Sequence, residues 1–141
     1  MEIDDSTYSL LAKRELPPLV SLQMVDIEGF VIFETTGKWL YPLFELEQFL
    51  IKQNIEPKSY FLHDRIAGRA AAALTYRLGF RYVKAHTMSS LATSLYDRLG
   101  VTFSYDVLVD SILCQTEKMF EDIDDIDYIY DVIDKRRIKS N

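Results

Sequence analysis

The sequence predicts a three-layer α/β/α sandwich with a mixed five-stranded sheet and a β-hairpin at one edge. Residues 19–34 hold two β-type runs separated by a turn that contains Gly29, which is the pattern of a hairpin. Residues 59–105 then alternate strand, helix, strand, helix, strand. Helical connections of this length make parallel, right-handed crossovers, so the hairpin should add an antiparallel edge to a parallel core.

Length and charge exclude several classes of protein. The chain has 141 residues, with 22 acidic and 16 basic side chains and a net charge of −6. This length suits a single domain with a real core, and the acidity argues against nucleic-acid binding. We expect no membrane span and no signal peptide, because no long apolar run occurs and the start of the chain is acidic. The single cysteine fits a cytoplasmic location.

The first half of the chain contains the hairpin and two predicted helices. A helix is expected over residues 5–16, capped by Asp5 or Ser6 and ended by a Pro-Pro pair. Strands over 19–25 and 30–34 form the hairpin. Apolar residues at helical spacing then predict an amphipathic helix over 39–54.

The second half continues the α/β alternation. We expect strands over 59–62, 80–85 and 101–105, with helices over 65–78 and 89–99 between them. Both helices end at a glycine, which is typical of a C-terminal cap. A last helix of the domain is expected over 106–120.

An acidic extension follows the predicted domain. The expected divisions are an N-terminal helix over 1–16, an α/β domain over 17–116 and a helical extension over 117–141. Five apolar residues of the extension are spaced alternately by four and three, as in a short coiled-coil seam: Met119, Ile123, Ile126, Tyr130 and Ile133. Such a helix either docks on its own domain or pairs with a second subunit. Pairing there, or along the hairpin's edge strand, would make a homodimer.

The candidate site begins where a predicted buried strand passes into a helix, at His63 and Asp64. Ligands bind at the carboxyl ends of strands in open α/β sheets, and helix N-termini attract anions. Arg65 and Arg69 are four residues apart on one helix face and therefore predict an anion site. Structural alternatives stay open: Asp64 as a helix cap, the arginines as solvated cations, and His63 as a hydrogen-bonded core histidine. Gly68 and the alanines after it also suit close packing of a helix on a sheet.

A second polar segment ends the next strand. Thr87, Ser89 and Ser90 follow His86, and one of the three hydroxyls is expected to cap the next helix. Neighbouring strand ends would bring these hydroxyls near Asp64. The ligand-binding set is therefore predicted as His63, Asp64, Arg65, Gly68, Arg69, Thr87, Ser89 and Ser90, with Asp64, Arg65 and Ser89 as the catalytic candidates.

No cofactor is expected. The sequence has no phosphate-binding glycine motif, and Cys114 lies in an apolar stretch that predicts a buried, unreactive thiol.

The segment from Asp64 to Ala72 resembles a small prokaryotic family of unknown function that has a cytidine-deaminase-like fold. The family pattern Asp-Lys-x-x-Gly-Lys-Ala-Ala-Ala is matched here with arginine in place of both lysines. Ser89 matches a serine that opens the family's following helix, and Pro42-Leu43 matches an early Pro-Leu. The resemblance covers residues 8–116 and implies the deaminase-like sandwich.

The resemblance to zinc deaminases fails at the metal. Those enzymes need a His or Cys, a Glu two residues later and a Pro-Cys-x-x-Cys segment. Here His63 is followed two residues later by Arg65, and residues 86–91 contain no cysteine. The sequence therefore predicts neither zinc nor zinc-dependent deamination.

Two functions remain from the sequence. The first is metal-independent binding, or turnover, of a small anionic or nucleotide-like metabolite by Arg65, Arg69, Asp64 and Ser89. The second is a non-enzymatic interaction or oligomerisation module with a vestigial pocket. Whether Arg65 lies unpaired in a concave site distinguishes the two.

Overall fold

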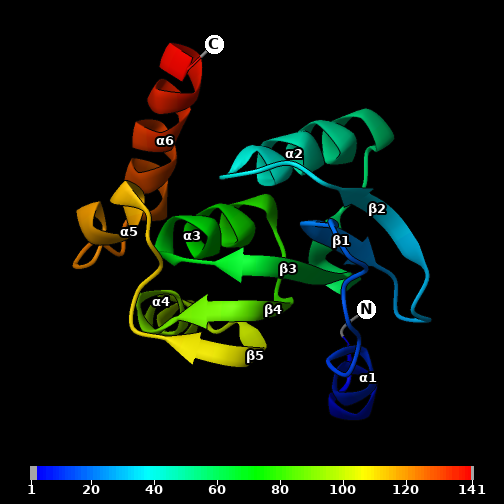
Figure 1. The fold of residues 1–141 in the computed structure, drawn as a ribbon. Helices are drawn as coiled ribbons and strands as arrows, with labels where there is room; N and C mark the ends of the chain where they lie inside the picture. Colours follow the sequence, from blue (N-terminus) through cyan, green and yellow to red (C-terminus); the bar gives the residue numbers. More distant parts are fainter. Residues whose placement is uncertain (1–2, 141) are drawn as a thin grey trace.

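The fold is an α/β domain built on one mixed five-stranded sheet (Figure 1). The computed structural model describes residues 3–140, with the side chains of residues 115 and 138–140 left out. The elements follow in the order α1 (Asp5–Leu11), β1 (Leu22–Val25), β2 (Val31–Thr35), α2 (Tyr41–Gln53), β3 (Phe61–Ala67), α3 (Arg69–Leu78), β4 (Tyr82–Ser89), α4 (Ser90–Leu99), β5 (Thr102–Val109), α5 (Gln115–Met119) and α6 (Ile126–Ser140). A short 3-10 turn, Pro57–Ser59, precedes β3.

The sheet has the strand order β2-β1-β3-β4-β5. The pairs β2–β1 and β1–β3 are antiparallel, whereas β3–β4 and β4–β5 are parallel. The predicted mixed sheet with a hairpin edge is therefore confirmed. Gly29 lies in the turn of the hairpin at φ 92°, a backbone conformation that residues with a Cβ rarely adopt.

Strand alternation divides the sheet into two different faces. One face carries Met24, Leu62 and Val83, which belong to the main core together with residues of α2, α3 and α4. The second face carries Phe61, which packs in a smaller cluster with Leu11 of α1. Figure 1 shows α1 standing apart from the other helices. Helices thus contact both faces, and the second face is covered only in part by α1 among the described residues.

Several boundaries differ from the sequence prediction. Strand β3 runs on to Ala67, so the helix expected from residue 65 begins only at Arg69, after the N-cap Gly68. The reason is pairing: β3 lies between β1 and β4, and both partners extend the strand through Asp64. Strands β4 and β5 are also longer than expected. In α1, the cap is Asp4, whose side chain accepts the Thr7 N–H at 2.7 Å, and the helix ends at Leu11.

The prediction of a helix over residues 106–120 is wrong. Strand β5 occupies its first part, through Val109, and only the short α5 is helical in the remainder. The apolar residues of this stretch fit both a helical and an alternating pattern, and pairing with β4 decides in favour of the strand.

The C-terminal helix packs on its own domain. Helix α6 contacts α3, and its residues Ile129 and Ile133 are fully buried in the main core. Figure 1 shows α6 beside α3 and α5. Of the two readings of the extension, docking on its own domain is the one observed. No described helix is both long and apolar enough to cross a bilayer.

Candidate functional site

Two adjoining hollows lie where β3 ends and α3 begins. Their volumes are about 240 and 280 Å³, and they share a wall made by Trp39, Leu40, Ile66 and Ala71. We refer to the pair as the Trp39 pocket. Its position at the carboxyl end of a parallel strand is where open α/β sheets place their ligands. Its lining is mainly apolar with a few polar groups, which is typical of small-molecule sites.

The half-buried Asp64 provides a carboxyl group at this pocket. It lies on β3 opposite Ala85 of β4 and borders the hollow on the side of α2. Burial raises the pKa of Asp64 to about 7, although backbone hydrogen bonds from Ile66 and Arg65 act in the opposite direction. A carboxyl group that titrates near neutral pH in a cavity is a candidate acid or base.

Glu117 provides a second carboxyl group, which is buried and which the sequence analysis did not select. Its Oε2 accepts the backbone N–H of Arg69 at 2.7 Å, and its Oε1 accepts the N–H of Ile112 at 3.4 Å. The carboxylate thus caps the N-terminus of α3, the role that the sequence analysis had considered for Asp64. Glu117 and Arg69 are 48 residues apart, so no local spacing in the sequence indicates this contact.

Gly68 makes this contact possible. A Cβ at Gly68 would lie 2.5 Å from Oε2 of Glu117 and 2.5 Å from Cδ1 of Ile112. The glycine is therefore required by the close approach of the capping carboxylate. Gly68 therefore serves close packing, and the side chains packed against it are Glu117 and Ile112.

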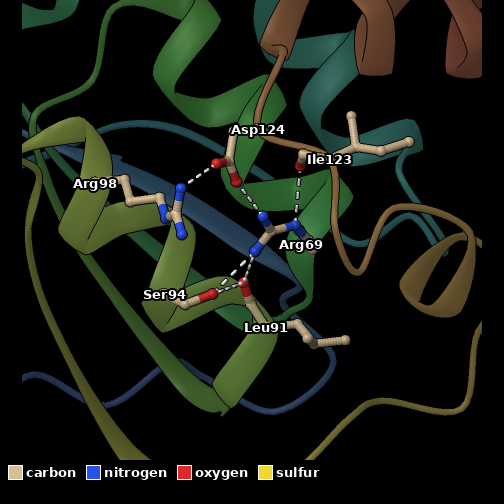
Figure 2. Close-up of polar contacts among 6 residues, drawn as sticks. All are labelled: Arg69, Leu91, Ser94, Arg98, Ile123 and Asp124. Atoms are coloured by element: carbon tan, nitrogen blue, oxygen red, sulfur yellow. Dashed lines mark hydrogen bonds and ion pairs between the residues drawn. The ribbon is translucent and has the colours of Figure 1, made fainter.

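Arg69 does not share a face with Arg65. Its guanidinium is buried and donates from Nε to the Ile123 carbonyl at 3.1 Å and from Nη1 to the Leu91 carbonyl and Ser94 Oγ at 2.7 and 2.9 Å. Its Nη2 pairs with Asp124 (Figure 2). All of these acceptors belong to the chain itself. Arg69 therefore fastens the C-terminal segment to α3 and α4.

Arg65 lies on β3 and not on a helix. Its Nε donates to the Val20 carbonyl and its Nη2 to the Pro17 carbonyl, each at 2.8 Å. It forms no ion pair with Asp64 among the described contacts. Arg65 borders the Trp39 pocket and also a cavity on the second face of the sheet, so it lies in a concave setting.

The three predicted hydroxyl residues do not join Asp64. Ser89 is buried and accepts the Ala92 N–H at 3.0 Å as the N-cap of α4, so the expected cap is confirmed. Ser90 donates to the Val109 carbonyl at 3.3 Å, and Thr87 lies on β4 opposite Ile66. None of the three is among the described residues that border the Trp39 pocket.

His63 faces away from the pocket. It is buried on the second face of the sheet, where burial, together with the positive charges of Lys84 and Arg14, lowers its pKa to about 4. Its Nδ1 has no hydrogen-bond partner in the described structure. His63 is therefore a core histidine, but this nitrogen lacks the hydrogen bond that was expected.

Among residues 3–140, apart from the side chains left out, no group of three or more His, Cys, Asp or Glu side chains could hold a metal ion. His63 lies on the face opposite the Trp39 pocket. Cys114 is half-buried at the start of α5, not within the expected helix, and its Sγ lies 3.0 Å from Thr116 Oγ1.

These features define an α/β protein with a mixed open sheet, six α-helices among the described residues and a pocket at the carboxyl end of its central strand. The profile of TM1506, a domain of unknown function (DUF1893), matches residues 20–136. The chain therefore belongs to the DUF1893 family. The match continues past residue 116, where the resemblance seen in the sequence had ended, and so includes Glu117 and Asp124.

A crystal structure of a DUF1893 family protein (TM1506) from Thermotoga maritima has a similar fold. The two chains are 24% identical, with a TM-score of 0.70 over 83% of this chain and 80% of that chain. Among curated proteins, none matches the sequence.

Proposed function

We propose that this chain is a zinc-independent small-molecule binding protein with a cytidine-deaminase-like fold, and that its ligand occupies the Trp39 pocket. The observation that carries the proposal is the half-buried Asp64, whose carboxyl group has a pKa near 7, at the carboxyl end of a central parallel strand. A cytoplasmic location accords with the half-buried free thiol of Cys114.

Two carboxyl groups of the pocket favour a ligand that donates hydrogen bonds. Asp64 and Glu117 both border it, and the N-terminus of α3 already holds the Glu117 carboxylate. The cations Lys38 and Arg65 border only the second of the two hollows. A phosphate bound at that helix would have to displace Glu117. A neutral or cationic amino or amide group, such as the donor edge of a nucleobase, would instead pair with Asp64. The flat ring of Trp39 offers a surface for stacking.

Any chemistry in this pocket would be proton transfer at Asp64. Its carboxyl group both accepts and donates a proton near neutral pH. Arg65 borders the same hollow and can contact an anionic part of the ligand, whereas Ser89 is engaged as a helix cap. Asp64 is thus the catalytic candidate that the geometry favours.

A thermal-shift series with adenosine, cytidine, guanosine and their free bases tests the proposal. A ligand at about 100 times its Kd stabilises the folded protein by roughly 2.7 kcal/mol, which raises Tm by several degrees. We expect such a shift with at least one compound, and its loss in Asp64→Asn. Asp97→Asn, an exposed carboxylate on α4, is the matched control. The absence of any shift, or an equal shift in Asp64→Asn, contradicts the proposal.

A second candidate function is self-association, and the observation that favours it is the outer edge of β5. Tyr105, Val107 and Leu108 are 40–47% exposed there, and β5 pairs with β4 alone among the described strands. Pairing of two β5 edges would make a homodimer with a continuous sheet. Sedimentation velocity of wild type and Val107→Lys tests this. A dimer that the lysine converts to monomer supports it, and a monomeric wild type rejects it.

A further inference from the structure

The second face of the sheet holds a polar cavity that the proposed function does not use. Its volume is about 690 Å³, and it is bounded by Ala12, Lys13, Glu15 and Leu16 and by side chains of β3, β4 and β5. The strand residues are His63, Arg65, Lys84, His86 and Asp106. We call it the sheet-face cavity. The register places His63 beside Lys84, and alternation brings the other three to the same face.

Two buried polar side chains form the floor of this cavity. Lys84 is 4% exposed, and its Nζ donates to the carbonyls of Ala12 and Arg14 at 2.6 and 3.0 Å. His63 is 1% exposed, and its Nδ1 has no partner in the described structure. Buried polar atoms are nearly always paired with protein, water or a ligand. The Nδ1 atom of His63 is therefore a buried polar atom at this cavity that lacks a hydrogen-bond partner.

The cavity is more positive than the chain around it. Three cations and two carboxylates are among its described lining residues, in a chain with a net charge of −6. Asp106 lies at the outer side, where it pairs with both Lys84 and His86 at 3.1 Å. Lys84 and Arg14 lower the pKa of His63, after the larger effect of burial, so positive charge dominates at the imidazole.

Arg65 borders this cavity with part of its guanidinium free of hydrogen bonds. The carbonyls of Val20 and Pro17 occupy its Nε and Nη2, while its Nη1 has no hydrogen bond to any described residue. These bonds fix the guanidinium without neutralising it, because carbonyls carry no net charge. A fixed guanidinium with a free N–H is the usual partner of a phosphate or carboxylate oxygen.

We propose that the sheet-face cavity binds a small oxyanion, a phosphate or a carboxylate, through Arg65 and the His63 imidazole, with the buried Lys84 charge beneath it. Neutral imidazole supplies one N–H donor to such an anion. The site lies on the face of the sheet opposite Asp64, and Arg65 is the one described residue that borders both this cavity and the Trp39 pocket.

The composition of the chain provides separate reporters for the two sites. The only two histidines, His63 and His86, both border the sheet-face cavity, and the only tryptophan, Trp39, borders the other pocket. Imidazole NMR signals therefore report on the oxyanion site. Trp39 fluorescence reports on the proposed base-like ligand, so failure of one proposal is distinguishable from failure of the other.

The test is a titration of the full chain with inorganic phosphate and, separately, with acetate, at an ionic strength held constant with sodium chloride. We expect a saturable shift of the His63 ring signals with at least one of the two anions, and the comparison identifies which oxyanion is preferred. In Arg65→Gln the affinity should fall about tenfold, the usual effect of losing one charge-assisted hydrogen bond. Lys52→Gln, an equal charge change at an exposed site on α2, should change the affinity less than about twofold.

Because Arg65 also anchors residues 17–20, a second variant keeps the test decisive. His63→Leu removes the unpaired Nδ1 from a buried position, so Tm should be unchanged or higher, while the affinity for phosphate or acetate, followed by the shift of His86, should fall about tenfold. No saturable shift with either anion overturns the proposal. Equal affinity in wild type and in folded Arg65→Gln or His63→Leu overturns it as well.

Discussion

The fold accommodates the carboxyl groups of the half-buried Asp64 and the buried Glu117 by different means. Glu117 accepts two backbone N–H groups, one of them the first N–H of α3, and so balances the positive end of a helix. Asp64 accepts backbone hydrogen bonds too, but burial outweighs them and raises its pKa. A carboxyl group therefore caps a helix at Glu117 and holds a proton at Asp64.

The raised pKa of Asp64 makes the stability of the protein depend on pH. Between about pH 4 and pH 7 the native state holds a proton that the unfolded state has lost, because the pKa rises from 3.8 to about 7 on folding. The contribution of Asp64 to the free energy of unfolding therefore falls as pH rises through this window and is constant above it. At about 1.4 kcal/mol per pKa unit, the loss is at most about 4 kcal/mol.

Asp64→Asn should abolish this contribution. Urea unfolding at about pH 8 is expected to show the variant more stable than wild type, with the difference vanishing at about pH 4. Asp97→Asn, at an exposed position, should track the wild type at both pH values. A variant that is less stable than wild type at pH 8 would show that the carboxylate makes a contact the fold needs.

At the scale of elements, the helix N-terminus that the sequence analysis placed at Asp64 lies instead at Gly68. Asp64, Arg65 and Ile66 are helix-compatible residues in sequence, but the segment is extended because β1 pairs with it as far as Asp64 and β4 as far as Ala67. Alternation along an extended strand then directs Asp64 and Arg65 to opposite faces of the sheet. The predicted single site is divided for this reason into two cavities that share Arg65 as a border.

The Arg69 contacts join three elements, and their removal should loosen the C-terminal segment. Arg69→Met keeps the apolar stem but removes the guanidinium that binds Asp124 and three further acceptors, although Asp124 retains its pairing with Arg98 (Figure 2). We expect a loss of about 3 kcal/mol in the free energy of unfolding and faster amide exchange over residues 121–137.

Arg98→Met is the matched control for Arg69. Arg98 pairs with the same Asp124 but is 69% exposed, so its loss should cost less than about 1 kcal/mol. Equal effects of the two substitutions would contradict the assignment of Arg69 as the fastening residue.

At the scale of the whole molecule, the C-terminal segment is part of the core. Phe120, Ile129 and Ile133 are fully buried against α3 and its neighbours, and the family profile extends to residue 136. At about 1.5–3 kcal/mol for each buried side chain, the three contribute roughly 5–9 kcal/mol, which is comparable to the total stability of a domain.

A chain that ends at residue 114 should therefore not fold cooperatively. It would expose the packing surface of α3 and remove Glu117 from the helix N-terminus. Circular dichroism should show no sigmoidal thermal transition, whereas Ile133→Ala in the full chain should lose about 2–4 kcal/mol and remain folded. The exposed Asp131→Ala is the control. A truncated chain with a Tm within a few degrees of wild type would contradict this account.

Much of the architecture could be predicted because it rests on local signals. The alternating runs of the hairpin, the glycines at positions 79 and 100 and the Ser89 cap each act within a few residues. The ends of β3 and β5 and the partners of Arg69 depend on pairing over long sequence separations, which no local pattern records. Asp64 was found because it follows a buried strand, whereas Glu117 reaches the site only through the folding of the chain.

The central claim is that the Trp39 pocket binds a small base-like molecule through Asp64, and a fluorescence titration tests it most directly. Trp39 is the only tryptophan in the chain and borders both hollows, so its emission reports on this pocket alone. Titration with adenosine, cytidine, guanosine and their bases should give saturable quenching by at least one compound, weakened about tenfold in Asp64→Asn. Emission that changes with none of them, or identically in wild type and variant, would contradict the account.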